Sequence, residues 1–167
     1  MKALNHQRGV GLVEILVALL VLAIGVLGFV ALQYRSLEAS AESTYRVQAI
    51  TLARDMAERI RVNRNSFGVY KTELETAAKQ KISAKKCVGS IVCTDTELAD
   101  FDVTQVAIKA ASLGMTMNIM ACQNTNNRQC IYVAWGNSSA TNGTGTGDCT
   151  NGNSYNPTST CVIMETY

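Results

Sequence analysis

A single carboxylate near the start of a long apolar stretch is the first residue whose position suggests chemistry. Glu14 is the only charged residue between Arg8 and Arg35, and Ile15 to Leu32 is a run of 18 residues without a charged or polar side chain. As a helix this run spans roughly 27 Å, close to the thickness of the hydrocarbon core of a bilayer. Burying an ionisable group there is costly, so Glu14 is a candidate functional residue that needs a stabilising partner.

The residues around Glu14 have a characteristic order. A short basic leader ends at Gly9, Glu14 follows five residues later, and the apolar run comes next. This arrangement resembles a type IV prepilin. In that family a prepilin peptidase cuts after the glycine, and the next residue becomes the N-methylated mature N-terminus. The resemblance implies processing at Gly9 and Val10, with Glu14 as the subunit-docking residue. Val10 stands where phenylalanine is usual, and Gly11 stands where threonine or serine is common.

Two simpler explanations of the apolar segment are a secretory signal and an ordinary membrane anchor. A secretory signal has an apolar core of about 7–15 residues followed by a small-residue cleavage site. The apolar run of this chain is longer, and no polar cleavage region follows Leu32. An ordinary anchor would not need Glu14. The pattern therefore favours a prepilin.

The charges predict a membrane topology. Lys2 and Arg8 precede the apolar segment, which indicates an N-terminus that stays in the cytoplasm. We expect a single-pass inner-membrane protein with a periplasmic head, which enters the pilus fibre on assembly. Lys2 and Arg8 also account for the net charge of +2, because removing both from the 15 basic residues leaves 13, equal to the 13 acidic residues. A neutral mature chain argues against a general polyanion binder.

The cysteines agree with export. All six lie beyond residue 86, and an even number of cysteines in an exported domain indicates disulfides. Six cysteines allow 15 pairings, and we favour the nearest-neighbour set: Cys87–Cys93, Cys122–Cys130 and Cys149–Cys161. The chain has no Cys-x-x-Cys sequence, and its only histidine is His6 in the leader. We therefore expect no metal site, no cofactor and no catalytic cysteine.

Hydrophobic periodicity predicts one long helix from about Val10 to about Arg61. Beyond Gln33 the apolar residues recur at spacings of three and four, as expected for a stripe that packs under a head domain. These residues are Leu37, Ala41, Tyr45, Ala49, Leu52, Met56 and Ile60. The predicted organisation is a leader (1–9), a transmembrane or fibre-core half-helix (10–32), an amphipathic half-helix (33–63) and a periplasmic head (64–167).

The head is predicted to combine helices with a small antiparallel sheet. The lysine-rich segment 70–86 is interpreted as a solvated short helix or loop, and Asp95 begins a helix that ends before Gly114. Three segments rich in β-forming residues predict strands at 115–122, 130–135 and 161–167. Residues 136–160 are interpreted as a polar loop. The fold class is therefore α+β, a type IV pilin-like fold in which a spine helix packs on a sheet with disulfide-closed loops.

A second resemblance narrows the family. The run from Asp55 to Arg64, Asp-Met-Ala-Glu-Arg-Ile-Arg-Val-Asn-Arg, is similar to the end of the spine helix in PilV-type minor pilins. The chain also resembles these proteins in having a cysteine loop followed by a short helix. The resemblance implies a structural subunit that helps to prime pilus assembly at or near the fibre tip. Its implied partners are the other minor pilins, the major pilin, prepilin peptidase and the inner membrane, with a tip adhesin as a further candidate.

Three other functions are alternatives to a structural minor pilin. An enzyme is disfavoured, because the sequence shows no phosphate loop, metal cluster or nucleophile elbow. A type II secretion pseudopilin shares the leader and spine, but acidic residues are too sparse here for the calcium site that such proteins often carry. A DNA-capturing minor pilin is the other alternative. The lysines of 70–86 would bind the DNA, but no aromatic residue between Lys71 and Lys86 could stack on bases.

Overall fold

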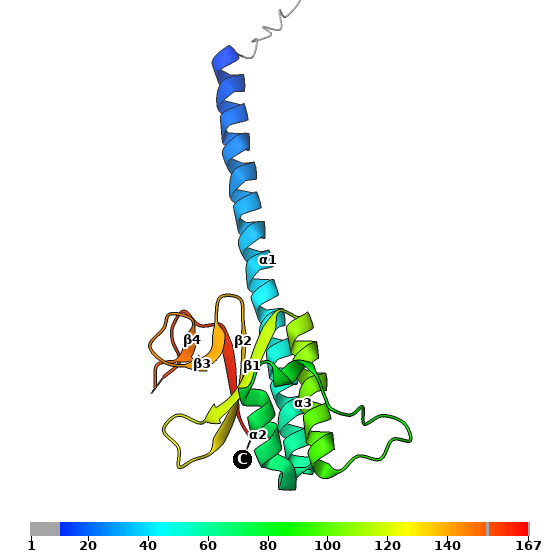
Figure 1. Cartoon of the computed structure of the whole chain (residues 1–167). Coiled ribbons are helices and arrows are strands. Elements are labelled where there is room, and N and C mark those ends of the chain that lie inside the picture. The colour runs from blue at the N-terminus through cyan, green and yellow to red at the C-terminus, as the bar shows by residue number, and fades with distance from the viewer. Residues whose placement is uncertain (1–10, 153, 167) are drawn as a thin grey trace, which may run out of the picture. The chain divides into compact units, whose positions relative to one another are not determined.

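One uninterrupted helix occupies the N-terminal third of the described chain. The computed structural model describes residues 11–152 and 154–166, so the processing residues Gly9 and Val10 lie outside the described part. Helix α1 runs over Leu12–Val62, 51 residues, which confirms the long helix predicted from the periodicity (Figure 1). The only proline, Pro157, is far from this segment and cannot break it. The chain divides within α1 into two compact units, Met1–Ser43 and Thr44–Tyr167.

Two further helices belong to the second unit. After the 3-10 turn η1 (Arg64–Ser66) comes α2 (Phe67–Glu75), followed by η2 (Lys79–Lys81) and α3 (Asp95–Ser112). The expected solvated character of residues 70–86 was wrong for α2. Tyr70 and Leu74 are 0% and 1% exposed, because their i, i+4 spacing places both on the face that meets the core.

Helix α3 begins where the sequence predicted. Thr94 accepts a hydrogen bond from the N–H of Glu97 at 3.3 Å, and the N–H of Thr94 donates to the Glu97 carboxylate at 2.8 Å. This reciprocal pair is a capping box, which satisfies backbone donors at the start of the helix. After Ser112 the chain turns at Gly114, whose φ of +70° suits a glycine and ends the helix.

The main sheet is antiparallel with strand order β1-β2-β5. Its strands are β1 (Met115–Ala121), β2 (Gln129–Trp135) and β5 (Cys161–Glu165). These confirm the three predicted strands, because no strand end differs from its predicted position by more than two residues. Met115, Met117 and Ile119 of β1 are buried in alternation, as expected for a strand with one face on the core. Strand β2 is the central strand and is buried over Cys130–Trp135.

The region predicted as a polar loop contains two more strands. β3 (Ser139–Asn142) and β4 (Asp148–Thr150) pair in parallel, with Ser139 opposite Asp148. The loop prediction for residues 136–160 was therefore wrong in part. The strands are short and made of turn-forming residues, so no alternating pattern marks them. Asp148 holds the turn between them by accepting hydrogen bonds from Thr141 Oγ1 and from the N–H of Gly145 at 2.8 Å.

Three disulfides close loops in the second unit. They join Cys87 to Cys93, Cys122 to Cys130 and Cys149 to Cys161, the pairs of the nearest-neighbour assignment. The first closes the loop before α3, the second joins the ends of the β1–β2 hairpin, and the third ties β4 to β5. Cysteines 122, 130 and 149 also pack with Tyr132, Ala134 and Ala140 in a second apolar cluster. This cluster explains why β2 is buried on both faces.

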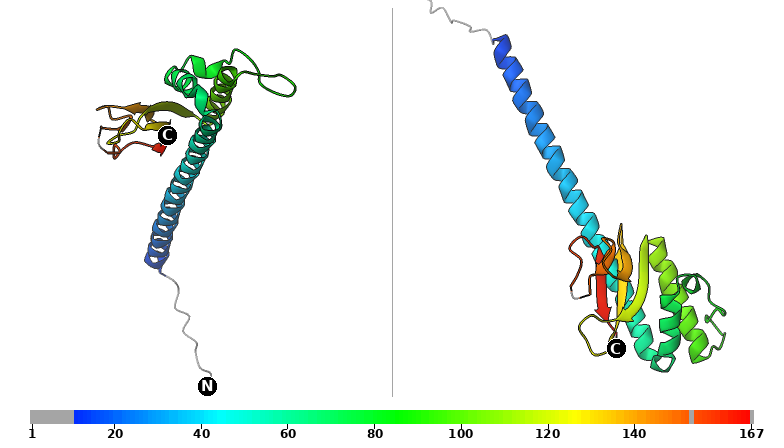
Figure 2. Two further views of the ribbon diagram at one scale, coloured as in Figure 1. Left: turned by 90° about the horizontal axis from the view of Figure 1, so that it is seen from below. Right: turned by 60° about the vertical axis from the view of Figure 1, so that its left-hand side comes forward.

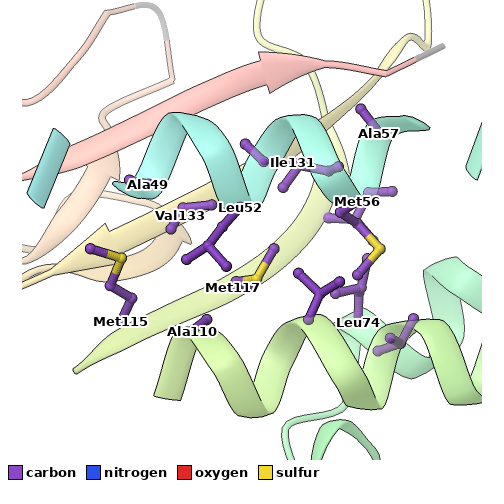
Figure 3. Packing of buried hydrophobic residues seen from close by; sticks show 14 of the residues in the cluster. Ala49, Leu52, Met56, Ala57, Leu74, Ala110, Met115, Met117, Ile131 and Val133 are labelled. Carbon is purple, nitrogen blue, oxygen red and sulfur yellow. The ribbon is translucent and has the colours of Figure 1, made fainter. Parts of the chain in front are cut away.

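The main core forms around the last third of α1. Figure 3 shows Leu52 and Met56 between residues of the sheet and of the other two helices, with Met117 and Val133 from strands and Leu74 from α2. The sheet lies on one side of this part of α1 and α3 on the other (Figures 1 and 2). The helix stripe that the sequence predicted under the head is therefore the centre of the core from Ala49 onwards.

Candidate assembly interface

The first unit exposes an apolar helix surface. Every large hydrophobic side chain from Leu12 to Leu37 is at least 51% exposed. A helix of that composition has no polar face to present to water, so its surface is suited to lipid or to other apolar helices. By length and composition α1 can cross a membrane, and it is the only such helix among the described residues.

Glu14 lies in the first turn of α1. Its N–H donates to the carbonyl oxygen of Gly11 at 2.9 Å, and the N–H of Ile15 donates to the same oxygen at 3.3 Å. A carboxylate in the first turn is favoured by the helix dipole. Within the described part of the chain, no side chain forms an ion pair with Glu14. Its charge therefore remains available for a group outside the described residues or on another molecule.

The burial of the amphipathic stripe begins later than the sequence predicted. Leu37 is 71% exposed and Tyr45 is 42% exposed, whereas Ala49 is fully buried. The expectation that Leu37, Ala41 and Tyr45 pack under the head was wrong for the structure of the chain. Periodicity identifies the face of a helix that is apolar, but it does not identify how far along the helix the covering domain reaches.

Charged and polar residues of the Asp55–Arg64 run have a structural role in the head. Arg59 Nε lies 2.8 Å from Asp55 Oδ1, and Arg59 Nη1 lies 2.5 Å from Asp102 Oδ1. Tyr70 Oη donates to Asp102 Oδ2 at 2.6 Å. Asn63 Nδ2 donates to the carbonyl oxygen of Asp95 at 2.7 Å. These contacts join the end of α1 to α2 and α3, so we name Arg59, Tyr70 and Asp102 the helix-joining cluster.

The surroundings of Tyr70 in the helix-joining cluster change its pKa. Burial, and then the hydrogen bond to Asp102, raise the pKa of Tyr70 well above its ordinary value. The phenol is therefore held in its protonated form, in which it can donate to the carboxylate. The arrangement suits a structural contact, because Arg59 and Tyr70 already donate hydrogen bonds to the two carboxylate oxygens of Asp102.

Sequence reasoning found only part of this cluster. The pair of Asp55 and Arg59 follows from their i, i+4 spacing on one helix. Asp102 has no basic residue three or four positions away in the sequence, and Tyr70 belongs to the segment expected to be solvated. The contact from Arg59 to Asp102 spans 43 residues, so no local pattern could reveal it. A charged residue placed among the apolar positions of α3 was the available signal.

Two family comparisons cover adjacent parts of the chain. Residues 4–30 match the prokaryotic N-terminal methylation motif, and residues 31–104 match the family described as type IV pilin Tt1218. No protein with curated annotation and no solved structure matches the chain significantly. The methylation motif contains Glu14 and most of the exposed apolar surface, while the pilin match contains the helix-joining cluster. The long helix and the disulfide-closed antiparallel head are consistent with a type IV pilin fold, so the chain carries a prepilin methylation motif followed by a segment similar to the type IV pilin family.

Proposed function

We propose that this protein is a structural minor pilin of the PilV type, which helps to prime assembly of the type IV pilus at or near the fibre tip. The observation that carries the proposal is the exposed apolar surface of α1 from Leu12 to Leu37, headed by Glu14. Pilins belong to a structural family, so the function of such a surface is to pack, first against lipid and then against other subunits. The similarity of residues 55–64 to PilV-type sequences supports the finer assignment.

Assembly follows from the properties of the helix. Prepilin peptidase cleaves after Gly9, and Val10 becomes the methylated N-terminus. The subunit waits in the inner membrane with residues 10–32 in the bilayer, its N-terminus cytoplasmic and residues 64–167 in the periplasm. It then moves into the fibre, where the apolar surface exchanges lipid contacts for contacts with neighbouring helices. Because both environments are apolar, the transfer does not require the surface to enter water.

Glu14 supplies specificity to this transfer. A carboxylate in an apolar core is strongly unfavourable alone, and an amine nearby offsets that cost. The methylated amine of Val10 on an adjacent subunit is the proposed partner, which fixes the axial position of one helix against the next. The contact partners are other minor pilins and the major pilin, and an adhesin at the tip is a further candidate.

The lysines of the head give little support to DNA capture. Of the five lysines in residues 70–86, Lys71, Lys79 and Lys85 are within 4 Å of a glutamate carboxylate. Ion-paired lysines are less available to phosphates, so the segment does not form a continuous basic stripe. A structural role explains the described head better than a nucleic-acid-binding role.

The experiment replaces the docking carboxylate. Glu14→Ala should leave leader cleavage and membrane insertion intact, while the amount of protein recovered in sheared pili falls by about tenfold or more because an unpaired amine remains in the fibre core. Glu58→Ala is the matched control, since it removes an exposed glutamate of the same helix. Quantitative immunoblots of membrane and pilus fractions measure both variants. Wild-type incorporation of Glu14→Ala would contradict the docking role.

A second measurement tests the minor-pilin assignment. The full chain, purified from membranes in mild detergent, should retain other minor pilins of the same pilus system. Deletion of the protein should lower the number of fibres per cell, and the wild-type chain should restore it. Recovery with components of a secretion system, together with normal piliation of the deletion strain, would favour a type II pseudopilin instead.

A further inference from the structure

A groove of about 400 Å³ lies on the head between α3 and residues 81–88, the segment that leads into the loop closed by Cys87–Cys93. Phe101, Thr104 and Ile108 of α3 line it at spacings of three and four, so they form one face of the helix. Ile82 and Val88 line it from the segment 81–88, and their side chains are 76% and 56% exposed. The groove therefore has an apolar lining along about two helical turns, or roughly 10 Å.

Two lysines and a buried hydroxyl supply polar groups to the groove. Lys81 and Lys86 both line it, and among the described residues neither forms an ion pair, unlike the other three lysines of this segment. The hydroxyl of Thr104 is buried and has no hydrogen-bond partner in the described part of the chain. An apolar groove with two available ammonium groups and a buried hydroxyl is complementary to an apolar stripe with carboxylates beside it.

The chain itself carries such a stripe. Leu37, Ala41 and Tyr45 recur at intervals of four on α1, and all three are exposed. Glu38 and Glu42 each follow a residue of the stripe, and the ten residues from Ser36 to Tyr45 contain no lysine or arginine. The stripe spans the nine residues from Leu37 to Tyr45, a rise of about 12 Å as a helix, which is close to the length of the groove.

We propose that the groove on the head of one copy binds the Ser36–Tyr45 segment of α1 from a second copy. Leu37, Ala41 and Tyr45 would pack on the apolar lining, while Glu38 and Glu42 face Lys81 and Lys86. The ion pair of Glu38 with Arg35 is solvent-exposed, so exchanging it for a lysine costs little. This is recognition of an amphipathic helix by a groove, with the apolar residues setting affinity and the charges setting register.

The two surfaces lie on different parts of the chain, so the contact is heterologous. A heterologous contact leaves one groove and one stripe free at the ends of each pair, and it can therefore propagate along a fibre. The segment Ser36–Tyr45 lies beyond the proposed transmembrane residues 10–32, so the contact can form outside the bilayer. This inference does not rest on the PilV assignment, because it concerns only two copies of this chain.

Site-specific photo-cross-linking tests the contact in the full chain. Ile108→p-benzoylphenylalanine places a cross-linker in the groove, in protein expressed in the membrane of a bacterial host. A mixture of heavy-isotope and unlabelled protein distinguishes cross-links between copies from those within one copy. We expect a light-dependent dimer in which the tryptic peptide Ser36–Arg46 of the second copy carries the cross-link. Ile91→p-benzoylphenylalanine is the control, because Ile91 is exposed but does not line the groove.

Charge reversal sharpens the test. Lys81→Glu with Lys86→Glu should lower the yield of dimer by about tenfold, because carboxylates then face carboxylates. Adding Glu38→Lys and Glu42→Lys to the same chain should restore most of the yield. Lys109→Glu, on α3 outside the groove lining, should have no effect. Disulfide mapping of each variant verifies that the head has folded.

The outcomes separate this contact from the proposed function. Cross-linking to a different peptide, absence of a dimer in the folded protein, or failure of the combined charge reversal to restore it would each overturn the inference. Incorporation into pili through the N-terminal helix would survive these results. Conversely, loss of pilus incorporation on changing Glu14 would leave the cross-link to Ser36–Arg46 unaffected.

Discussion

The two ends of α1 contain similar apolar residues but differ in what surrounds them. From Leu12 to Leu37 every large hydrophobic side chain is at least 51% exposed, whereas Leu52, Met56 and Ile60 are at most 2% exposed. The first end is apolar on all sides from Ile15 to Leu32, and the second is apolar on one stripe with charged residues beside it. A one-sided stripe can be covered by the chain's own head, but a helix that is apolar all round must find its surroundings in a membrane or in other subunits.

The comparison is most strongly tested by removing the same side chain from each end. Leu52→Ala should lower the free energy of unfolding of the head by about 3–4 kcal/mol, because it creates a cavity in a fully packed core. Leu20→Ala should change that free energy little, since Leu20 is 60% exposed. Urea unfolding of the full chain in detergent micelles, followed by the fluorescence of Trp135, measures both. Equal effects would show that the two ends share one cooperative unit.

The effects of removing two different disulfides compare the stability of two parts of the head. Replacing Cys149 and Cys161 by serine should destabilise the head by about 3 kcal/mol, because the bridge closes a longer loop and ties β5 to β4. Replacing Cys87 and Cys93 should cost less, since that bridge spans 6 residues instead of 12 and closes an exposed loop. The urea midpoints of the two double variants give the order. A larger loss for the Cys87–Cys93 variant would contradict the comparison.

The smallest expected effect concerns how the free energy of unfolding of the head depends on pH. Because the folded head raises the pKa of Tyr70 above the ordinary value of 10.0, an unfolded chain releases this proton first, and stability falls as pH rises above about 10. Below that pH the contribution is fully present. Tyr70→Phe should reduce the alkaline decline by up to about 1.4 kcal/mol per pH unit. Tyr34→Phe, at an exposed tyrosine of the first unit, should leave the slope unchanged, and equal slopes in all three proteins would refute the argument.

The sequence predicted most elements whose pattern is local. The 51-residue helix, the start of α3 and the three main strands follow from periodicity, capping residues and β-forming residues. The nearest-neighbour pairing of cysteines also matches the structure, because each pair lies at the ends of a short loop. These features depend on residues within about a dozen positions of one another.

Features that depend on distant residues were missed. Asp102 and Tyr70 meet Arg59 only after α2 and α3 have packed on α1, so their roles could not be derived from spacing. Strands β3 and β4 pair through backbone groups in a segment of glycine, serine, threonine and asparagine, which has no alternating pattern. The exposure of Leu37 depends on where the head ends, which periodicity does not encode.

The N-terminus of the assembled protein tests the central claim most directly. Mass spectrometry of protein from sheared pili should find a chain that begins at Val10 and carries one added methyl group, as expected for a processed pilin whose apolar helix packs in the fibre. Gly9→Ala should instead leave the precursor uncut and confined to the membrane fraction. An intact Met1 in pili, or a mature chain that begins beyond Leu32, would contradict the account.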